Sequence, residues 1–561
     1  MTADLEPTSP KTIAVLCCDF EHAAIGTRSR LCDQIAGRPL WMHVLERLLA
    51  VGGLNEIVVA APESQLSLTA PFKIDDRIQI IPLAARSPQI SARIRTARAW
   101  NLQSWRGGAG QCTFFDEEYH PQALSFAAKQ FNADHVLHIH SHSVFLDVEM
   151  TTALIHHHLH KNHEMRITYT PTAPGLSGLV LRADIVHEMA EKAAMPWQLL
   201  AYDPKAPTFD TLIRDACMQV DPALSKIPNR FCADTDRSFA FAQSWHGRPA
   251  HDGQNDHSSA ALALAAARTI APGVRDFSQT HPTPRELETE LTGKRLTTPP
   301  GAVPQLIRES RGELSPSHWT RWLTSQRFPD DLLLTFAGDG DPLLYPALLD
   351  VLRAARQAHP LSICLQTDLT TDNLQPLLTA IDENLIDILS ITTYGHTAAT
   401  YNRLSNTTLH AQLMKNLATL APITTARGGL PLVIPRLLKV RDTIPELEPF
   451  FDTWLQQTTW AVIDYPTDRA GQIPFTGVID MAPPKRRPCR RLWDRLVIRA
   501  NGVAVACDQD MNDQLKLGNI ESHTLEQLWS GPPMSALRQS HADSNWSAVS
   551  PCTNCKEWHR A

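Results

Sequence analysis

The sequence contains no apolar run long enough to cross a membrane, and its first residues, MTADLEPTSPKT, lack the apolar core of a secretory signal. Neither sign of charge dominates, since 52 basic and 59 acidic residues leave a net charge of only −7, which gives no reason to expect nucleic acid. The eleven cysteines are odd in number and scattered, unlike a disulfide framework. We therefore expect a cytoplasmic protein with no membrane or nucleic-acid partner.

Length and composition indicate a globular protein of several domains. A chain of 561 residues with 43% apolar and 20% charged residues exceeds the size of one ordinary core. The composition changes at residues 246–284, where HGRPAHDGQNDHSS precedes an alanine-rich stretch and SQTHPTP. We predict an α/β protein with domains at residues 1–245, 285–484 and 485–561, and a linker at 246–284.

Four of the eleven cysteines lie near the end of the sequence, at Cys489, Cys507, Cys552 and Cys555. Alternating apolar residues around Asn501-Gly502 predict a β-hairpin that brings the first two together, and the final Cys-x-x-Cys lies on a loop that can fold back. Four thiolates gathered in this way indicate a metal centre, either Zn²⁺ or an iron–sulfur cluster. A zinc ribbon usually has two Cys-x-x-Cys knuckles, and only one is present. Five basic residues near the first cysteine would suit a net-anionic cluster: Lys485, Arg486, Arg487, Arg490 and Arg491.

The order of motifs in this region is specific. A cysteine and Leu-Trp are followed by the Asn-Gly hairpin, Cys-Asp-x-Asp, Leu-Gly-Asn-Ile, a Leu-x-x-Leu-Trp helix and Cys-x-x-Cys. This order resembles a SPASM/Twitch domain, the C-terminal extension of many radical S-adenosylmethionine enzymes, in which four cysteines hold an auxiliary [4Fe-4S] cluster. The resemblance implies one such cluster here, whereas cysteine spacing alone leaves structural Zn²⁺ as the alternative. The implied ligands are Cys489, Cys507, Cys552 and Cys555.

The middle of the sequence alternates strands and helices, which predicts a parallel sheet closed as a partial β/α barrel. The expected strands are residues 332–338, 361–367, 388–394, 430–435 and 460–466. The stretch FAGDGDPLLYPALLDVL resembles the core of radical S-adenosylmethionine enzymes, where a Gly-Gly-Glu-Pro-type turn receives the methionyl amine of the cofactor. The matching residues, with Asp in place of Glu, are Gly338, Gly340, Asp341 and Pro342.

The signature that holds the radical cluster is absent. In the family, Cys-x-x-x-Cys-x-x-Cys commonly follows a Glu-Leu-Thr, which is present here at residues 290–292. By count, the cysteine positions are occupied by Arg295, Pro299 and Ala302, none of which ligates iron. The sequence therefore predicts that S-adenosylmethionine is not cleaved reductively, although the turn could still bind it weakly.

The first domain begins with a βαβ unit made of a strand at Thr12–Cys17, a helix within residues 37–53 and a strand within residues 55–64. A further strand within residues 134–147 and a helix over Met150–His160 continue the pattern. Strands that alternate with helices in this way predict a doubly wound sheet.

The segment Ala36-Gly-Arg-Pro-Leu, followed by a Val-Leu-Glu-Arg-Leu helix, resembles the sugar-nucleotide cytidylyltransferases over roughly the first 240 residues by pattern order. Their Gly-rich phosphate loop corresponds to CDFEHAAIGTRSR, which has one glycine, and Arg30 stands in place of the family's lysine. Of the two aspartates that hold Mg²⁺, one corresponds to His142 and the other to Asp234 or Asp236.

The histidines of this domain allow two interpretations. Alternation along one strand places three side chains on one face, and two more lie one helical turn apart. Such a group could bind a borderline transition metal, but we favour a polar surface strand and helix. The residues are His138, His140, His142, His156, His160 and His163.

Both catalytic domains lack residues that their reactions require, whereas the four cluster ligands are complete. This combination resembles the spiro-SPASM family, which consists of SPASM-containing spirochaete proteins that lack a radical cluster. The resemblance implies a cytoplasmic iron–sulfur protein that acts as a binding, scaffold or electron-carrying partner of an unidentified protein or small molecule. The alternative is a divergent sugar-nucleotide transferase that uses Arg30 and Asp234 or Asp236, with a regulatory C-terminal half. The sequence assigns no catalytic residue and leaves open whether the protein is an enzyme.

Overall fold

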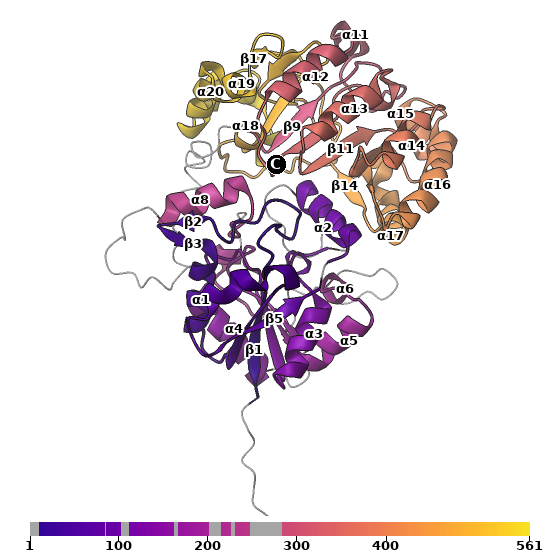
Figure 1. Ribbon diagram of the computed structural model, residues 1–561. Coiled ribbons are helices and arrows are strands. Elements are labelled where there is room, and N and C mark those ends of the chain that lie inside the picture. The colour runs from indigo at the N-terminus through magenta and orange to yellow at the C-terminus, as the bar shows by residue number, and fades with distance from the viewer. Residues whose placement is uncertain are drawn as a thin grey trace, which may run out of the picture. The chain divides into compact units, whose positions relative to one another are not determined.

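The computed structural model describes residues 10–84, 86–101, 112–161, 166–200, 215–225, 230–246 and 283–560 (Figure 1). The chain divides into two compact units, residues 1–95 with 103–268 and residues 96–102 with 269–561. The predicted linker at 246–284 lies almost entirely outside the described residues, and the predicted domain boundaries stay predictions. None of the described helices is both long and apolar enough to cross a membrane.

The elements up to residue 246 are β1 (Thr12–Cys17), β2 (Gln34–Ile35), β3 (Arg38–Pro39), α1 (Leu40–Ala50), β4 (Glu56–Pro62), η1 (Glu63–Phe72), β5 (Ile78–Leu83), α2 (Pro88–Trp100), η2 (Phe114–Asp116), α3 (Pro121–Gln130), β6 (His135–Ile139), α4 (Val148–Lys161), β7 (Ile167–Thr168), β8 (Leu179–Arg182), α5 (Ala183–Glu191), α6 (Trp197–Leu200), α7 (Pro222–Ser225) and α8 (Asp236–His246). The η elements are short 3₁₀ turns. The larger sheet has the order β5-β4-β1-β6-β8-β7, in which β5, β4, β1 and β6 are parallel.

The first unit is a doubly wound sheet, because both faces of its central strand are covered. All six residues of β1 are buried, as expected for a parallel strand between two helical layers. Ala14 and Leu16 pack with α1 and α4, whereas Ile13 and Val15 pack with α3 and α5 (Figure 1). The predicted βαβ unit and doubly wound sheet are thus confirmed.

The strand predicted within residues 134–147 is shorter than expected. β6 ends at Ile139, because the chain then turns: the Ser143 amide donates to the His140 carbonyl at 3.0 Å, and the Val144 amide donates to the His142 carbonyl at 2.9 Å. His140 and His142 are 5% and 1% exposed, and His138 is also buried. The interpretation of a polar surface strand is therefore wrong.

The helical histidines fit the surface interpretation. His156 and His160 are exposed on α4, with ring centroids 5.8 Å apart. His163 lies outside the described residues.

The second unit contains β9 (Glu286–Thr289), α11 (Gln305–Ser310), α12 (Pro316–Ser325), β10 (Leu333–Phe336), η4 (Pro342–Leu344), α13 (Leu348–Gln357), β11 (Ser362–Thr367), α14 (Gln375–Asp382), β12 (Ile388–Thr393), α15 (Ala398–Ser405), α16 (His410–Ala426), β13 (Leu432–Leu438), η5 (Arg441–Glu446), α17 (Leu447–Thr458), β14 (Val462–Asp464), α18 (Arg491–Asp494), β15 (Arg495–Ile498), β16 (Val503–Val505), β17 (Lys516–Asn519), α19 (Leu525–Ser530), α20 (Pro532–Ala542), η6 (Trp546–Ala548), η7 (Cys552–Asn554) and η8 (Glu557–His559). Strands β9 to β14 are parallel neighbours in sequence order, as the predicted β/α pattern requires. The predicted α/β fold class is confirmed.

The two faces of this sheet differ in chemistry. Leu287, Leu334 and Ile363 are register neighbours on the face that packs against the helices. The opposite face carries buried polar side chains, and Thr335 donates to Glu286 at 2.7 Å there. Alternation of side chains along each strand separates the apolar core from this polar face.

The hairpin predicted around Asn501-Gly502 is present as β15 and β16, with Gly502 at a φ of +78° in the turn. Strand β15 also pairs in parallel with β9, so the sheet continues as β9-β15-β16-β17. Arg495 lies beside Glu286 in this register and donates to its carboxylate at 2.7 Å. A buried ion pair therefore joins the C-terminal hairpin to the first strand of the parallel sheet.

Candidate functional sites

The four predicted cysteine ligands lie on loops at the ends of short elements. Cys489 precedes α18 and is buried, whereas Cys507 follows β16, and Cys552 and Cys555 lie at the two ends of η7; these three are partly exposed. Backbone amides point at two of the sulfurs, since Gln509 donates to Cys507 Sγ at 3.4 Å and the amide of residue 557 donates to Cys555 Sγ at 3.3 Å. Such N–H···S bonds stabilise negative charge on sulfur.

The structure brings these four thiols close enough to affect one another electrostatically. Burial, together with the neighbouring Cys489, raises the pKa of Cys552 to about 12 and that of Cys555 to about 11. Burial, Asp508 and the other thiols hold the pKa of Cys507 well above its usual range. Four thiols that resist ionisation together need a cationic centre to become thiolates.

Arginines hold the ligand loops together. Arg491, two residues after Cys489, donates to Asp508 at 2.6 Å, next to Cys507. Arg486 donates to the backbone carbonyl of Cys552 at 2.7 Å. Two of the five predicted basic residues therefore tie the loops of the cysteine group to one another.

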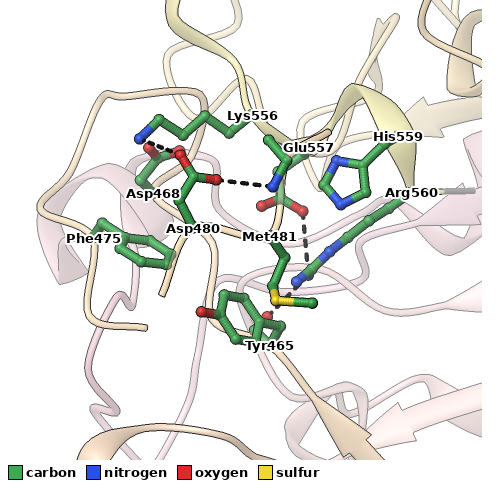
Figure 2. Close-up of a pocket in the computed structure, with 10 residues that line it drawn as sticks. Tyr465, Asp468, Phe475, Asp480, Met481, Lys556, Glu557, His559 and Arg560 are labelled. Carbon is green, nitrogen blue, oxygen red and sulfur yellow. Dashed lines mark hydrogen bonds and ion pairs between the residues drawn. The ribbon is translucent and has the colours of Figure 1, made fainter. Parts of the chain in front are cut away.

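A shallow pocket lies immediately beyond Cys555 (Figure 2). Its charged side chains pair within the protein: Lys556 contacts Asp480 at 2.9 Å, and Arg560 contacts Glu557 at 3.2 Å while lying over the Tyr465 ring. Two ion pairs therefore line the pocket, each with one partner from the residues that follow Cys555.

The glycines of the turn predicted to bind S-adenosylmethionine are required by the close approach of residues 290–293. Gly338 has a φ of +130°, and a Cβ there would lie 2.7 Å from the Glu290 side chain. A Cβ on Gly340 would lie only 1.9 Å from the Thr292 carbonyl oxygen. The turn following β10 is thus tightly packed against the segment that carries the cluster cysteines in radical enzymes.

The carboxylate of the turn is already bound within the protein. Asp341, just before Pro342 and η4, accepts from the Thr367 hydroxyl at 2.8 and 2.9 Å and from the amides of Leu343 and Asp368 at 3.0 Å. Burial and the neighbouring Asp368 raise the pKa of Asp341 to about 6. Three donors within the chain, one hydroxyl and two amides, thus take up most of the acceptor positions that a ligand amine would need.

Arg295, at the first missing cysteine position, forms a bidentate ion pair with Asp368. Its Nε and Nη2 atoms lie 2.8 and 2.5 Å from the two carboxylate oxygens. Tyr394 donates to the same carboxylate at 2.8 Å and receives a bond from Arg295 at 2.7 Å, while Thr297 also donates to Asp368. Arg295 is therefore held in a salt-bridge network around the buried Asp368 carboxylate.

A second group of buried ion pairs continues from this turn. Asp339 accepts from Arg311 and from Arg469, both at 2.7 Å, and Arg311 also contacts Glu290 at 3.0 Å. Arg469 further donates to the carbonyl of Asp508 at 2.9 Å. These contacts link the turn after β10 to the residue that follows Cys507.

In the first unit, backbone amides of the loop that resembles a phosphate loop donate hydrogen bonds to a carboxylate of the same loop. The Asp19 carboxylate accepts from the amides of Glu21 at 2.9 Å and His22 at 3.0 Å. Arg30 forms ion pairs with Asp236 and with Asp33, the latter at 3.2 Å. The loop amides and the arginine that the resemblance assigns to phosphate thus have partners within the chain.

The predicted metal-binding residues of this unit each contact a different partner. His142 Nδ1 lies 3.3 Å from Glu118, Asp234 lies 3.3 Å from Arg230, and Asp236 contacts Arg30. Sequence reasoning missed Glu118 and Arg230. The adjacent Glu117 and Glu118 in FFDEEYH were the available signal for a charged site, but the local sequence did not indicate that these glutamates are buried.

Comparison with known proteins bears on both units. Residues 489–556 match the family model described as the SPASM iron-sulfur cluster-binding domain, which confirms the predicted SPASM domain. An uncharacterized protein of Treponema pallidum (strain Nichols) is 25% identical over 214 residues, which cover 36% of this chain and 58% of that protein. The match thus spans less than two thirds of the relative's length.

Solved structures with similar folds include both predicted classes. BtrN in complex with AdoMet and 2-DOIA is 16% identical, covering 48% of this chain and 92% of that chain, with a TM-score of 0.33. A cytidylyltransferase from Leptospira borgpetersenii serovar Hardjo-bovis is 10% identical, covering 46% and 95%, also with a TM-score of 0.33. Of these comparisons, the family match assigns the C-terminal part of the chain to an iron–sulfur cluster-binding domain.

Proposed function

We propose that this protein is a cytoplasmic, non-radical iron–sulfur protein that holds one [4Fe-4S] cluster and serves as a binding, scaffold or electron-transfer partner. The cluster ligands are Cys489, Cys507, Cys552 and Cys555. The observation that carries the proposal is the Arg295–Asp368 ion pair, which stands where a radical cluster would be ligated, beside a complete set of four converging cysteines.

The family match favours an iron–sulfur cluster over a single Zn²⁺ ion, because residues 489–556, which begin at Cys489 and include the other three cysteines, match a model described as an iron-sulfur cluster-binding domain. In a [4Fe-4S] cluster each of the four thiolates would bind a different iron.

Exposure supports a role in electron transfer or partner binding. Three of the four ligands are partly exposed, so one edge of the cluster lies near the protein surface. Four protein thiolates leave no open iron to bind a substrate. All eleven cysteines are free thiols, which suits a reducing cytoplasm.

The turn at Gly338–Pro342 supports at most weak binding of S-adenosylmethionine, because the Asp341 carboxylate already accepts from one hydroxyl and two amides of the chain. The transferase alternative is disfavoured, because Asp19 takes the loop amides and Arg30 is paired with carboxylates.

Anaerobic purification followed by iron, sulfide and zinc analysis tests the proposal. We expect about four iron and four sulfide per chain, with an electron paramagnetic resonance signal appearing on reduction. Stoichiometric zinc without sulfide would contradict it.

A further inference from the structure

A buried group of two histidines and one glutamate lies in the first unit, where β6 ends. One ligand atom each of Glu118, His140 and His142 lies within 4.8 Å of the other two. The Nδ1 atoms of both histidines are 3.3 Å from the same carboxylate oxygen, Glu118 Oε1. All three side chains are at most 5% exposed. We infer that this group is a binding site for one divalent transition-metal ion of the Zn²⁺ class.

The chain holds these three side chains in position through hydrogen bonds. The amide and hydroxyl of Ser141, between the two histidines, donate to the Glu118 carboxylate at 2.5 and 2.7 Å. The turn bonds from Ser143 and Val144 fix the backbone that carries His140 and His142. Hydrogen bonds of this kind orient ligand side chains before an ion binds.

The charges around the group leave this carboxylate available to an ion. Glu117 and Asp234, on the other side of His140, form ion pairs with Arg230. In the described part of the chain, Glu118 forms ion pairs with His140 and His142 alone. Arg230 therefore neutralises one side of the group, whereas Arg86 lies near Glu118 but donates to the backbone carbonyls of Glu117 and Tyr119 and not to this carboxylate.

One ring nitrogen strengthens the inference. His142 Nε2 is buried and has no hydrogen-bond partner among the described residues. Buried polar atoms in folded proteins normally have a partner, and an unpaired one calls for a ligand, ion or water. A metal ion coordinated by Nε2 would give this buried nitrogen the partner that the described residues do not supply.

The donor set selects the class of ion. Two imidazoles and a carboxylate suit Zn²⁺ and other borderline divalent ions, whereas Mg²⁺ takes oxygen ligands. This set also differs from the aspartate pair that the cytidylyltransferase resemblance implies, since Asp234 and Asp236 both contact arginines.

The first experiment uses the full chain with all four C-terminal cysteines changed to serine, so that zinc at the cluster site is not counted. Equilibrium dialysis against Zn²⁺ with elemental analysis should give about one zinc per chain. Glu118→Gln and His142→Gln in this background should each weaken zinc binding at least about tenfold. The matched control, His156→Gln with His160→Gln, changes an exposed histidine pair of the same unit and should bind zinc as before.

The second measurement does not depend on how the variants fold. X-ray absorption at the zinc edge of the wild-type, cluster-replete chain should show nitrogen and oxygen neighbours at about 2.0–2.1 Å. A shell of sulfur at about 2.3 Å, no retained zinc, or equal zinc binding by the Glu118 and His142 variants and the control would overturn the proposal. Iron and sulfide in the same sample report separately on the cluster, so failure of either proposal is recognised independently.

Discussion

Arg295 and Asp368 form a bidentate ion pair in the second unit. The two residues are 73 positions apart in sequence, yet both oxygens of the buried Asp368 carboxylate contact the guanidinium. The pair is further enclosed by Tyr394 and Thr297. Three side chains from two separate parts of the unit thus surround the Asp368 carboxylate.

Removing this arginine should destabilise the second unit. Arg295→Ala leaves the Asp368 carboxylate buried and unpaired, which costs about 3–5 kcal/mol of unfolding free energy. Calorimetry of the full chain should show a lowered transition. Arg353→Ala, which breaks an exposed ion pair with Glu383, should change little. An equal effect of the two substitutions would mean that the Arg295 pair is not structural.

Loss of one cluster ligand should abolish the visible absorption. Cys507→Ser removes a thiolate from a set of four, so we expect loss of most of the iron and of the broad band near about 400 nm. Cys32→Ser changes an exposed cysteine of the first unit and should retain both. Retention of the full iron content by Cys507→Ser would show that other groups hold the cluster.

The cluster-replete protein should not cleave S-adenosylmethionine. With dithionite and the cofactor, 5′-deoxyadenosine should stay at the level of a Cys507→Ala, Cys552→Ala control, because a cluster with four cysteine ligands has no open iron. Chromatography of the reaction measures the product. Formation above the control would mean that a further, open cluster exists.

The first unit should release no pyrophosphate from CTP above background with Mg²⁺ and an acceptor sugar. The loop amides are bound to Asp19 and Arg30 is paired with carboxylates, so neither is directed at a phosphate. A coupled pyrophosphate assay measures this, with an active cytidylyltransferase as positive control. Robust release would restore the transferase alternative.

Acid should destabilise the first unit through its buried histidines. Burial lowers the pKa values of His138 and His158 to about 3, below the value near 6.5 of the unfolded chain. The unfolded chain therefore binds more protons, and stability is lost as pH falls from about 6.5 towards 3. Asp116, whose pKa burial raises to about 6, opposes this trend between about pH 4 and 6.

A variant comparison separates these contributions. His138→Gln should reduce the slope of thermal stability against pH by up to about 1.4 kcal/mol per pH unit, whereas His156→Gln on the surface should leave it unchanged. Calorimetric scans of the full chain between pH 7 and pH 4.5 measure the difference. An unaltered slope in His138→Gln would show that this histidine is protonated in the folded state.

The sequence by itself determined the features that depend on neighbouring residues. The Asn501-Gly502 hairpin, the strand–helix alternation and the glycine turn after β10 follow from local patterns, and the structure contains all three. The presence of Arg295 at the first expected cysteine position was likewise evident from the sequence. Such features are predictable because backbone geometry and periodicity act over a few residues.

Only the tertiary structure decided which distant charges meet and which polar residues are buried. Arg495 meets Glu286 across 209 positions and makes the hairpin part of the larger sheet. The alternating histidines after residue 134 resemble a solvent-facing strand, because polar side chains are usually exposed. His140 is buried instead, since Glu118 from a distant turn supplies the charge that makes burial of an imidazolium tolerable.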